Sequence, residues 1–429
     1  MLRGVKVALK AVDGLGIRSI IDNRYIDTHF QPIVSIRKKM TIGIEALSRG
    51  WNTVTGEIVL PQTLFSQAAR ADLTVELDRL CRNTALDNYK QVLRQNPGLL
   101  LFLNLDTSII DRGVVGSKHL INKVKQLDLD PENIVIEFIE SRMNDTRSLK
   151  RFIDTYKGYG FMVALDDLGL GHSNLDRILH IKPDIIKLDR GLVKDIDQDY
   201  YKQEICKCIV NMARKIGALV IAEGVETMGE VITSMELGID MLQGFYFAKP
   251  QKLTDVTLCC LKDEIGRAAS VFKDMKAQKT FLEKRQCDFC FTAIEEVVNE
   301  LRMINSNDFD MKLAELILEY PMFEYLYVLD MLGMQVTDSI SGLTCAKTKN
   351  RMFQSDRRGT DQSLKEYCIH IQAGFERYTT DPYMSLATGD LCITNSVAFS
   401  NPDGAKFILC SDINPNLIKD GYVPLGTKS

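Results

Sequence analysis

Seven short apolar segments of the chain each end in a polar residue that can bind a metal ion or transfer a proton. Any one of these residues could simply mark the point where a strand reaches solvent. Seven in succession favour a shared pocket instead, and carboxylates that converge there repel one another unless cations neutralise them. The pattern therefore predicts a divalent metal site. The segments are 42–45, 99–104, 134–137, 162–166, 185–187, 219–223 and 241–243, and they end in Glu45, Asn104, Glu137, Asp166, Lys187, Glu223 and Gln243.

The elements that must position these residues follow from the periodicity between residues 28 and 250. Short apolar runs alternate there with longer stretches of helical periodicity, which is the pattern of repeated βα units around a parallel sheet. In a barrel of parallel strands the carboxyl ends of all strands lie on one face, and active sites occupy that face. Residues distant in sequence would then meet around one pocket.

The composition sets limits on the class of protein. The chain has 429 residues, 45% of them hydrophobic, and this length predicts at least two domains. A formal net charge of -4 gives no general attraction to a nucleic acid polymer. The sequence contains neither a secretory signal nor an apolar run long enough to span a membrane, so we expect a cytoplasmic protein. The 11 cysteines are expected to be reduced thiols, and the pair Cys287 and Cys290 is expected to pack within a helix rather than bind metal.

The segment Glu45-Ala46-Leu47-Ser48-Arg49 resembles the signature of EAL-type cyclic di-GMP phosphodiesterases. The rest of that family's pattern follows in order across residues 28–250, which makes the resemblance specific. It consists of Gln31-Pro32-Ile33, Asn104 in Phe-Leu-Asn-Leu, Glu137 and Glu140 in Ile-Glu-Phe-Ile-Glu, Asp166-Asp167-Leu168-Gly169, Lys187 in Ile-Lys-Leu-Asp, Ala222-Glu223-Gly224-Val225-Glu226-Thr227 and Gln243-Gly244. The resemblance implies an α/β fold of the TIM-like (β/α)8 barrel type.

The resemblance also implies a two-metal site. A first ion would be held by four residues, with Asp166 bridging to a second ion that Asp167 and Glu223 complete. Oxygen ligands of this kind favour Mg²⁺ or Mn²⁺. Lys187 would position or help to activate the water nucleophile, and Glu223 would act as a ligand or general base. The four residues implied for the first ion are Glu45, Asn104, Glu137 and Asp166.

Other residues are expected to contact the substrate or to support the site. Arg49 lies two residues beyond Leu47 in an extended segment, on the same side as Leu47 and Glu45, and is suited to bind a phosphate. The resemblance assigns Glu140 to stabilising the loop after Asp167. That loop departs from the family pattern at Leu168, Leu170 and His172, which bears on loop-mediated signalling and activity. The expected substrate-binding residues are Gln31, Leu47, Arg49, Glu226 and Gln243.

The C-terminal third has a different pattern. Helical stretches at about 252–275 and 285–320 predict a helical connector over 252–320, between a barrel at 1–251 and a smaller α+β domain at 321–429. The last segment resembles Cache or PAS-like sensor domains, and the domain order resembles the YkuI type of EAL protein. Such domains regulate a neighbour through a small-molecule pocket or a homodimer. Candidate pocket residues are Arg357, Arg358, Tyr383 and Thr388, although a structural role fits Tyr383 and the turn at Thr388 somewhat better.

Three functional hypotheses remain at this point. The leading one is an enzyme that opens cyclic di-GMP to linear pGpG. The alternative is a weak or inactive phosphodiesterase that binds cyclic di-GMP as an effector and acts through a protein partner. In the third, the barrel is a scaffold and only the sensor domain matters. The complete set of polar residues at strand ends favours the enzyme.

Overall fold

The computed structural model describes residues 16–52, 55–106, 118–139, 146–169, 176–252, 255–342 and 353–415. The chain divides into two compact units, Met1–Lys276 and Ala277–Ser429, with the boundary inside a long helix. We describe each unit separately. No helix among the described residues combines the length and the apolarity needed to cross a membrane.

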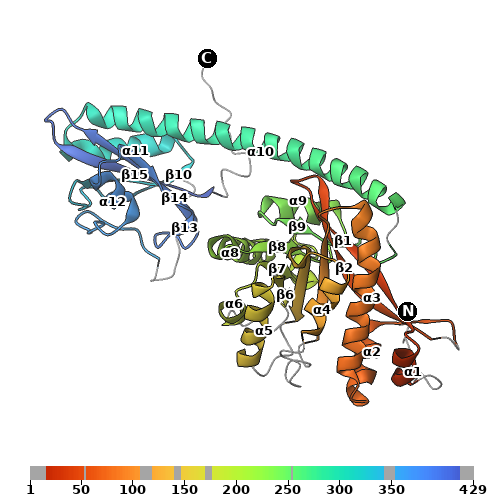
Figure 1. Cartoon of the computed structure of the whole chain (residues 1–429). Helices are drawn as coiled ribbons and strands as arrows, with labels where there is room; N and C mark the ends of the chain where they lie inside the picture. Colours follow the sequence, from red (N-terminus) through yellow and green to blue (C-terminus); the bar gives the residue numbers. More distant parts are fainter. Residues whose placement is uncertain are drawn as a thin grey trace, which may run out of the picture. The chain divides into compact units, whose positions relative to one another are not determined.

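The first unit is a closed barrel of eight strands with an additional short strand, β3, beside it (Figure 1). Consecutive strands from β4 to β9 pair in parallel, as the sequence predicts. One strand differs from a parallel barrel, because β1 runs antiparallel to both β2 and β9 and closes the cylinder. The strands are β1 Ile26–Ser35, β2 Met40–Trp51, β3 Ile58–Val59, β4 Leu100–Leu105, β5 Ile134–Ile139, β6 Met162–Leu168, β7 Ile185–Leu188, β8 Leu219–Ala222 and β9 Met241–Leu242.

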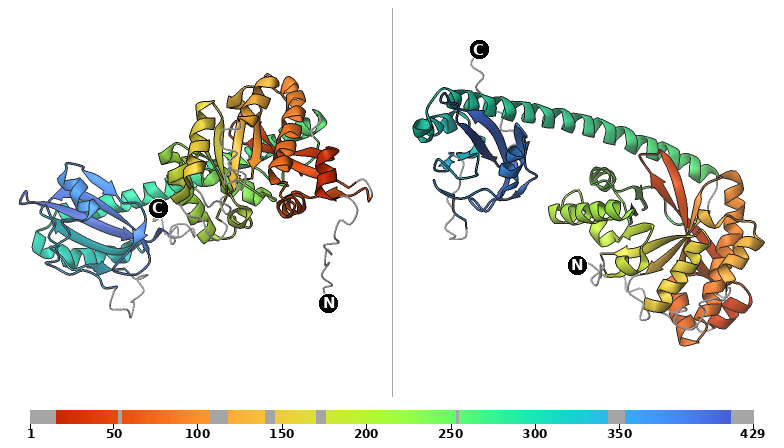
Figure 2. Two further views of the ribbon diagram at one scale, coloured as in Figure 1. Left: turned by 60° about the horizontal axis from the view of Figure 1, so that its bottom comes forward. Right: turned by 60° about the vertical axis from the view of Figure 1, so that its left-hand side comes forward.

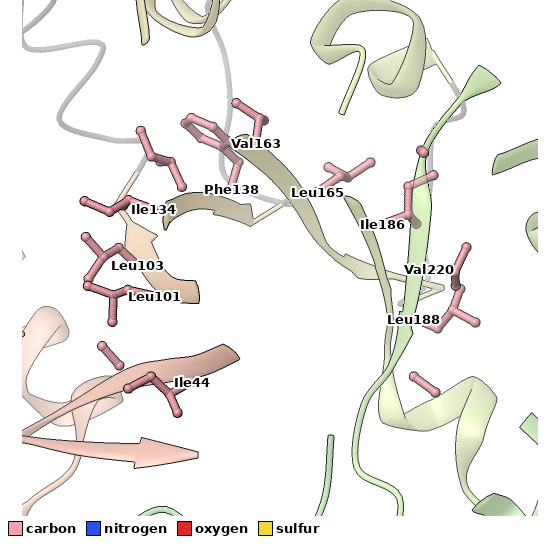
Figure 3. Packing of buried hydrophobic residues seen from close by; sticks show 14 of the residues in the cluster. Ile44, Leu101, Leu103, Ile134, Phe138, Val163, Leu165, Ile186, Leu188 and Val220 are labelled. Carbon is pink, nitrogen blue, oxygen red and sulfur yellow. The ribbon is translucent and has the colours of Figure 1, made fainter. Parts of the chain in front are cut away.

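Helices cover the outside of the barrel, as the views in Figure 2 show. Because side chains alternate along a strand, every second residue points outward into a layer shared with these helices. Figure 3 shows part of this layer, including Leu103, Phe138 and Leu165, which belong to one buried cluster with the helical residues Tyr89 and Phe152. The helices are α1 Ile17–Asp22, α2 Pro61–Arg70, α3 Thr74–Gln95, α4 His119–Gln126, η2 Pro131–Asn133, α5 Thr146–Gly158, α6 Asp176–Ile181, α7 Arg190–Val193, α8 Tyr200–Ile216 and α9 Met228–Glu236.

The intervening strand residues point inward and fill the barrel. A separate buried cluster contains one apolar residue from each of seven strands. On β2 the corresponding position is Gly43, where a Cβ atom would lie 2.7 Å from the ring of Phe102 and 3.0 Å from the carbonyl oxygen of Leu100. The barrel floor is therefore packed without room for a side chain on β2. The seven residues are Ile33, Phe102, Val135, Ala164, Ile185, Ile221 and Met241.

One continuous helix, α10 Asp255–Arg302, covers most of the stretch expected at 252–275, the interval 276–284 and the first part of the stretch expected at 285–320. The sequence of α10 contains no proline, and its one glycine, Gly266, has nothing within 4 Å of an added Cβ atom, so nothing interrupts the backbone hydrogen bonds. The helical region ends with η4 Ser306–Asp308 and α11 Phe309–Glu319, just before Pro321.

The second unit contains an antiparallel sheet in the order β11-β10-β15-β14-β12, with β13 also paired to β14. Residues of α10 and α11, such as Val297 and Leu313, pack on one face, and Tyr367 and Ile371 of α12 pack on the other. The elements are β10 Phe323–Asp330, β11 Ile340–Ser341, α12 Glu366–Gln372, β12 Arg377–Thr379, β13 Tyr383–Met384, β14 Leu391–Ser400 and β15 Lys406–Ile413.

Candidate active site

A polar layer lies directly above the apolar floor of the barrel. On each parallel strand it comes two residues after the floor residue, so it faces the same interior. On β1 it comes two residues before Ile33, because that strand runs in the opposite direction. The sequence therefore identified these strand-end residues correctly as neighbours. The layer consists of Gln31, Glu45, Asn104, Glu137, Asp166, Lys187, Glu223 and Gln243.

Lys187 is the charged centre of this layer and is fully buried, with 0% of its surface exposed. Its Nζ atom lies 2.5 Å from Oε1 of Glu223 and 2.7 Å from Oε1 of Glu137. It is also 3.4 Å from Oδ1 of Asp166 and 3.5 Å from Oε2 of Glu45. A buried ammonium group is tolerated only with such compensation, so these carboxylates hold Lys187 in its charged form.

Neutral amides orient Glu45. Asn104 Nδ2 donates to Oε1 of Glu45 at 2.8 Å, and Gln243 Nε2 donates to Oε2 at 2.6 Å. Gln243 Nε2 also donates to Oε1 of Gln31 at 3.2 Å, and Gln31 is the register partner of Glu45 across β1 and β2. Side chains on β1, on β4 and just after β9 thus hold the Glu45 carboxylate in a single orientation.

Asp166 and Asp167 both face the site although they are consecutive residues. In a regular strand they would point to opposite sides, but the pairing of β6 with β7 shifts register between Leu165 and Leu168. Asp167 has a left-handed backbone with φ of 58°, and its N–H donates to Oδ1 of Asp166 at 3.0 Å. As a result, carboxylate oxygens of Asp166, Asp167 and Glu223 lie within 4.8 Å of one another.

The electrostatics of the site reflect too much negative charge for one ammonium group. Burial raises the pKa of Glu137 well above its usual value, and the charges of Glu45 and Asp166 add to this. Burial and the charge of Asp166 likewise raise the pKa of Asp167 to about 6. Burial raises the pKa of Glu223 to about 8, even though Lys187 opposes the shift.

The pKa values of Lys187 and Glu45 shift in the directions that keep both groups charged. Burial alone would lower the pKa of Lys187, but the surrounding carboxylates, led by Asp166, raise it well above its usual value. Burial alone would raise the pKa of Glu45, but Lys187 and the amides of Gln243 and Asn104 lower it. Glu45 is therefore the carboxylate best suited to remain ionised.

This donor set fits hard divalent cations. It offers carboxylate and amide oxygens only, and oxygen donors are preferred by Mg²⁺, Mn²⁺ and Ca²⁺. Five carboxylates face a single buried ammonium group, so added cations would relieve a repulsion that otherwise favours protonation. The five carboxylates are those of Glu45, Glu137, Asp166, Asp167 and Glu223.

A pocket of about 740 Å³ opens beside Glu45 and Asn104. It is bounded by Leu47 on β2, Phe65 on α2 and Arg82 on α3. Arg82 is itself buried and donates from Nε to Oδ2 of Asp78 at 2.9 Å. Sequence reasoning missed the contribution of α2 and α3; the available signal was an ion pair at i,i+4 spacing within an otherwise apolar helix face.

Two further residues, Arg49 and Glu226, were expected to bind substrate. Arg49 is half-buried on β2; burial lowers its pKa, and the nearby charge of Glu45 opposes this shift. Glu226 pairs with Arg190 at 2.8 Å in a largely exposed position. Its backbone N–H donates to Oε2 of Glu230 at 2.7 Å, so the cap of α9 fixes this loop.

Some expectations fall on residues outside the described ranges. These are the loop-stabilising role of Glu140 and the departures at Leu170 and His172. Leu168 is described and buried at the end of β6. The cysteines whose side chains the structure describes are free thiols, including Cys287 and Cys290 on α10.

The family model of the EAL domain matches residues 17–250. The chain belongs to the EAL domain family. This match coincides with the barrel, and the signature Glu45-Ala46-Leu47 lies on β2 at the wall of the pocket. The polar layer is thus the interior of an EAL barrel.

Two curated relatives from Escherichia coli strain K12 match about half of this chain. The probable cyclic di-GMP phosphodiesterase PdeB is 27% identical over 233 residues, covering 54% of this chain and 44% of PdeB. The cyclic di-GMP phosphodiesterase PdeR is 31% identical over 240 residues, covering 54% of this chain and 35% of PdeR. The chain therefore spans less than half the length of either relative.

A third relative matches along nearly the whole chain. The EAL-domain protein YkuI of Bacillus subtilis strain 168 is 24% identical over 416 residues, covering 94% of this chain and 97% of YkuI. The crystal structure of YkuI, solved in complex with c-di-GMP and calcium, covers 94% of this chain with a TM-score of 0.75 at 24% identity. This likeness confirms the expected fold, an EAL barrel of the TIM-like type.

Proposed function

We propose that this EAL barrel hydrolyses cyclic di-GMP to linear pGpG with the help of divalent cations. The observation that carries the proposal is the complete polar layer around Lys187, in which carboxylates from four strands approach one ammonium group within 3.5 Å. The names of PdeB and PdeR support the same reaction for relatives of the barrel, and YkuI was crystallised with c-di-GMP.

The metal ligands of this proposal are residues of the polar layer. Glu45, Asn104, Glu137 and Asp166 would hold one ion, and Asp166 would share a second with Asp167 and Glu223. Bound Mg²⁺ or Mn²⁺ would supply charge neutralisation on the phosphate and a water of lowered pKa. The close approach of Asp166, Asp167 and Glu223 supports the second site.

The chain's own groups then position the water and the substrate. In the overall reaction, a water oxygen bonds to phosphorus, the bond from phosphorus to the 3′ oxygen breaks, and a proton reaches the leaving oxygen. Lys187 would hold the water in line through its N–H donors, and Glu223 would accept its proton. Arg49 would bind a phosphate oxygen from the adjacent wall of β2.

The amide side chains and the pocket complete the proposed substrate site. Gln31 and Gln243 fix Glu45 and would line the floor near the reacting phosphate. Leu47 contributes to the wall of the pocket of about 740 Å³ beside Glu45, which would admit part of the dinucleotide. A direct role for Glu226 would require it to leave its ion pair with Arg190.

Product analysis with purified protein tests the proposal. Cyclic di-GMP is incubated with Mg²⁺ or Mn²⁺, and pGpG is separated by chromatography. Wild type should form pGpG only with metal, and Glu45→Ala should form none. The matched control is Glu76→Ala, an exposed glutamate at the start of α3, which should retain full activity.

The effector alternative makes a different prediction in the same experiment. Calorimetric binding of cyclic di-GMP without pGpG formation, with both metals, would replace the enzyme by a binding protein. Retention of the full ligand set argues against that outcome, because binding alone does not require a residue positioned to hold water.

Further proposals concern the regulation, assembly, location and domain division of the whole chain. We propose regulation by the second unit as a Cache or PAS-like sensor domain, homodimerisation and a cytoplasmic location. The division into 1–251, 252–320 and 321–429 belongs with them. Of the candidate pocket residues, Tyr383 hydrogen-bonds Thr394, whereas Arg358 pairs with Asp310 at an exposed position. Light scattering of the full chain tests the dimer.

A further inference from the structure

One face of the sheet in the second unit combines aromatic and acidic side chains. Tyr327 of β10 and Cys410 of β15 pack there with Tyr367 of α12, in a cluster separate from the core formed with α10 and α11. Asp412 lies two residues beyond Cys410 on β15 and therefore points to the same face. A carboxylate thus enters an otherwise apolar and aromatic layer.

Asp412 is 6% exposed and has weak compensation for its charge. Its Oδ1 accepts a hydrogen bond at 2.6 Å from Thr394, whose hydroxyl lies 2.6 Å from that of Tyr383. The thiol of Cys392 also acts on Asp412, and Lys365 exerts only a minor charge effect on it. Neutral hydroxyl and thiol groups stabilise a buried carboxylate much less than a cation does.

A second buried carboxylate acts on Asp412. Glu324 is 3% exposed and lies in β10 at the position where the pairing with β15 shifts register. Its Oε1 accepts from Nδ2 of Asn414 at 3.3 Å, and Asn414 follows Asp412 by two residues along the same face. Its Oε2 is buried without a hydrogen-bond partner among the described residues. An unpartnered carboxylate oxygen at such a site requires a proton or a donor beyond the described residues.

No described cation meets this requirement. Among the described residues, neither Glu324 nor Asp412 has an ion-pair partner. Lys312 pairs with Glu300 and Glu315, and Arg358 pairs with Asp310. Burial raises the pKa of Asp412, and the charge of Glu324 raises it further. The two carboxylates therefore form an acidic site whose natural complement is a bound cation.

We propose that Glu324 and Asp412 bind the ammonium group of a small organic amine in the second unit. An ammonium group has three N–H donors, which match the free oxygen of Glu324, the carboxylate of Asp412 and the hydroxyl pair of Thr394 and Tyr383. Tyrosine rings beside the carboxylates favour an organic cation, because their faces attract positive charge. This inference does not depend on the reaction proposed for the barrel.

The test is thermal unfolding of the full chain with defined probes. The amine probes are ethanolamine, putrescine and the common free amino acids; ethylene glycol serves as the neutral counterpart of ethanolamine, and MgCl₂ and CaCl₂ as the metal arms. At saturation, an amine should raise the melting temperature by about 3 °C or more, and ethylene glycol should not. Glu324→Gln and Asp412→Asn should abolish the shift. Glu376→Gln, an exposed glutamate of the same unit, should retain it.

Hydrogen exchange of the wild type provides a readout that needs no variant. An amine that binds as proposed should slow exchange in β14 and β15. The proposal is overturned if no amine shifts melting or exchange, which would mean that the carboxyl groups carry a proton. It is equally overturned if only the metal salts act, or if the amine shift persists in Glu324→Gln.

Discussion

At the scale of single residues, the barrel interior is an unbalanced set of charges around Lys187. One ammonium group approaches carboxylates on β2, β5 and β6 and just after β8, and burial together with the excess negative charge raises the pKa of Glu137 and Glu223. Residue types and their positions at strand ends were sufficient to predict this set. The amide network around Glu45 could not be predicted in this way, because hydrogen bonds between Gln31, Gln243 and Glu45 depend on closure of the barrel.

Replacing Lys187 by methionine should lower both stability and turnover. The variant leaves a cluster of buried carboxylates without a counter-ion, and breaking a buried ion pair from one side costs about 3–5 kcal/mol. Urea unfolding without added metal, followed by fluorescence of Trp51, the single tryptophan and a residue of β2, should show this loss in the barrel. Lys262→Met, at an exposed position of α10, should unfold like wild type; equal stability of the two variants would contradict the charge argument.

Divalent cations should stabilise the barrel selectively. Binding to the folded state alone contributes about 2.7 kcal/mol when the free ion is about 100-fold above its Kd. The Trp51 transition should therefore move to higher urea in Mn²⁺ and return with a chelator. Glu45→Gln should reduce this gain strongly, whereas Glu324→Gln in the second unit should leave it intact. A shift of equal size in both variants would place the metal elsewhere.

At the scale of elements, the site depends on how the strands pack beneath it. The floor of the barrel has a ring of Phe102 where β2 carries Gly43, and this close approach sets the height at which Glu45 meets Asn104. The register shift of β6 brings Asp166 and Asp167 to the same side. Periodicity along one strand could not predict either feature, because each is a relation between neighbouring strands.

Gly43→Ala should destabilise the barrel. Its new methyl group would lie 2.7 Å from the Phe102 ring and 3.0 Å from a backbone oxygen, and overpacking of this kind costs about 1–3 kcal/mol. Gly266→Ala in α10, where nothing lies within 4 Å, should instead stabilise by about 0.5–1 kcal/mol through helix propensity. Equilibrium unfolding of both variants by Trp51 fluorescence and circular dichroism checks the opposite signs.

At the scale of the whole molecule, two units with separate cores share one helix. α10 begins in the first unit and ends in the second, where Val297 and Leu301 join the core with α11. The sequence pattern placed the helical region correctly but divided it, because the middle of α10 is polar on most sides and lacks a clear apolar face. α10 is continuous because it contains no proline and its one glycine does not break the backbone hydrogen bonds.

The stability of the second unit should decrease as pH rises. Burial raises the pKa of Asp412 to about 7, from about 3.9 for an exposed aspartate, so the folded unit binds a proton that the unfolded chain has released. The resulting stabilisation is complete below about pH 4 and is lost as the pH rises through about 7, at about 1.4 kcal/mol per pKa unit. Asp412→Asn should remove most of this dependence. Denaturant unfolding of both proteins from about pH 5 to about pH 8, without added amine, checks it; parallel pH profiles would contradict the assignment.

The sequence by itself indicated which residue types the candidate site contains and where in the chain they lie. Glu45, Asn104, Glu137, Asp166, Lys187 and Glu223 could be found because strand ends mark one face of a barrel, and because side-chain type limits which ions they bind. Tertiary structure decided which of these groups touch, that β1 runs antiparallel and brings Gln31 opposite Glu45, and that α2 and α3 form a pocket beside them. It also placed Glu324 where its charge raises the pKa of the buried Asp412. These features depend on strand order and closure, which arise from contacts between distant segments and leave no periodic signal in either one.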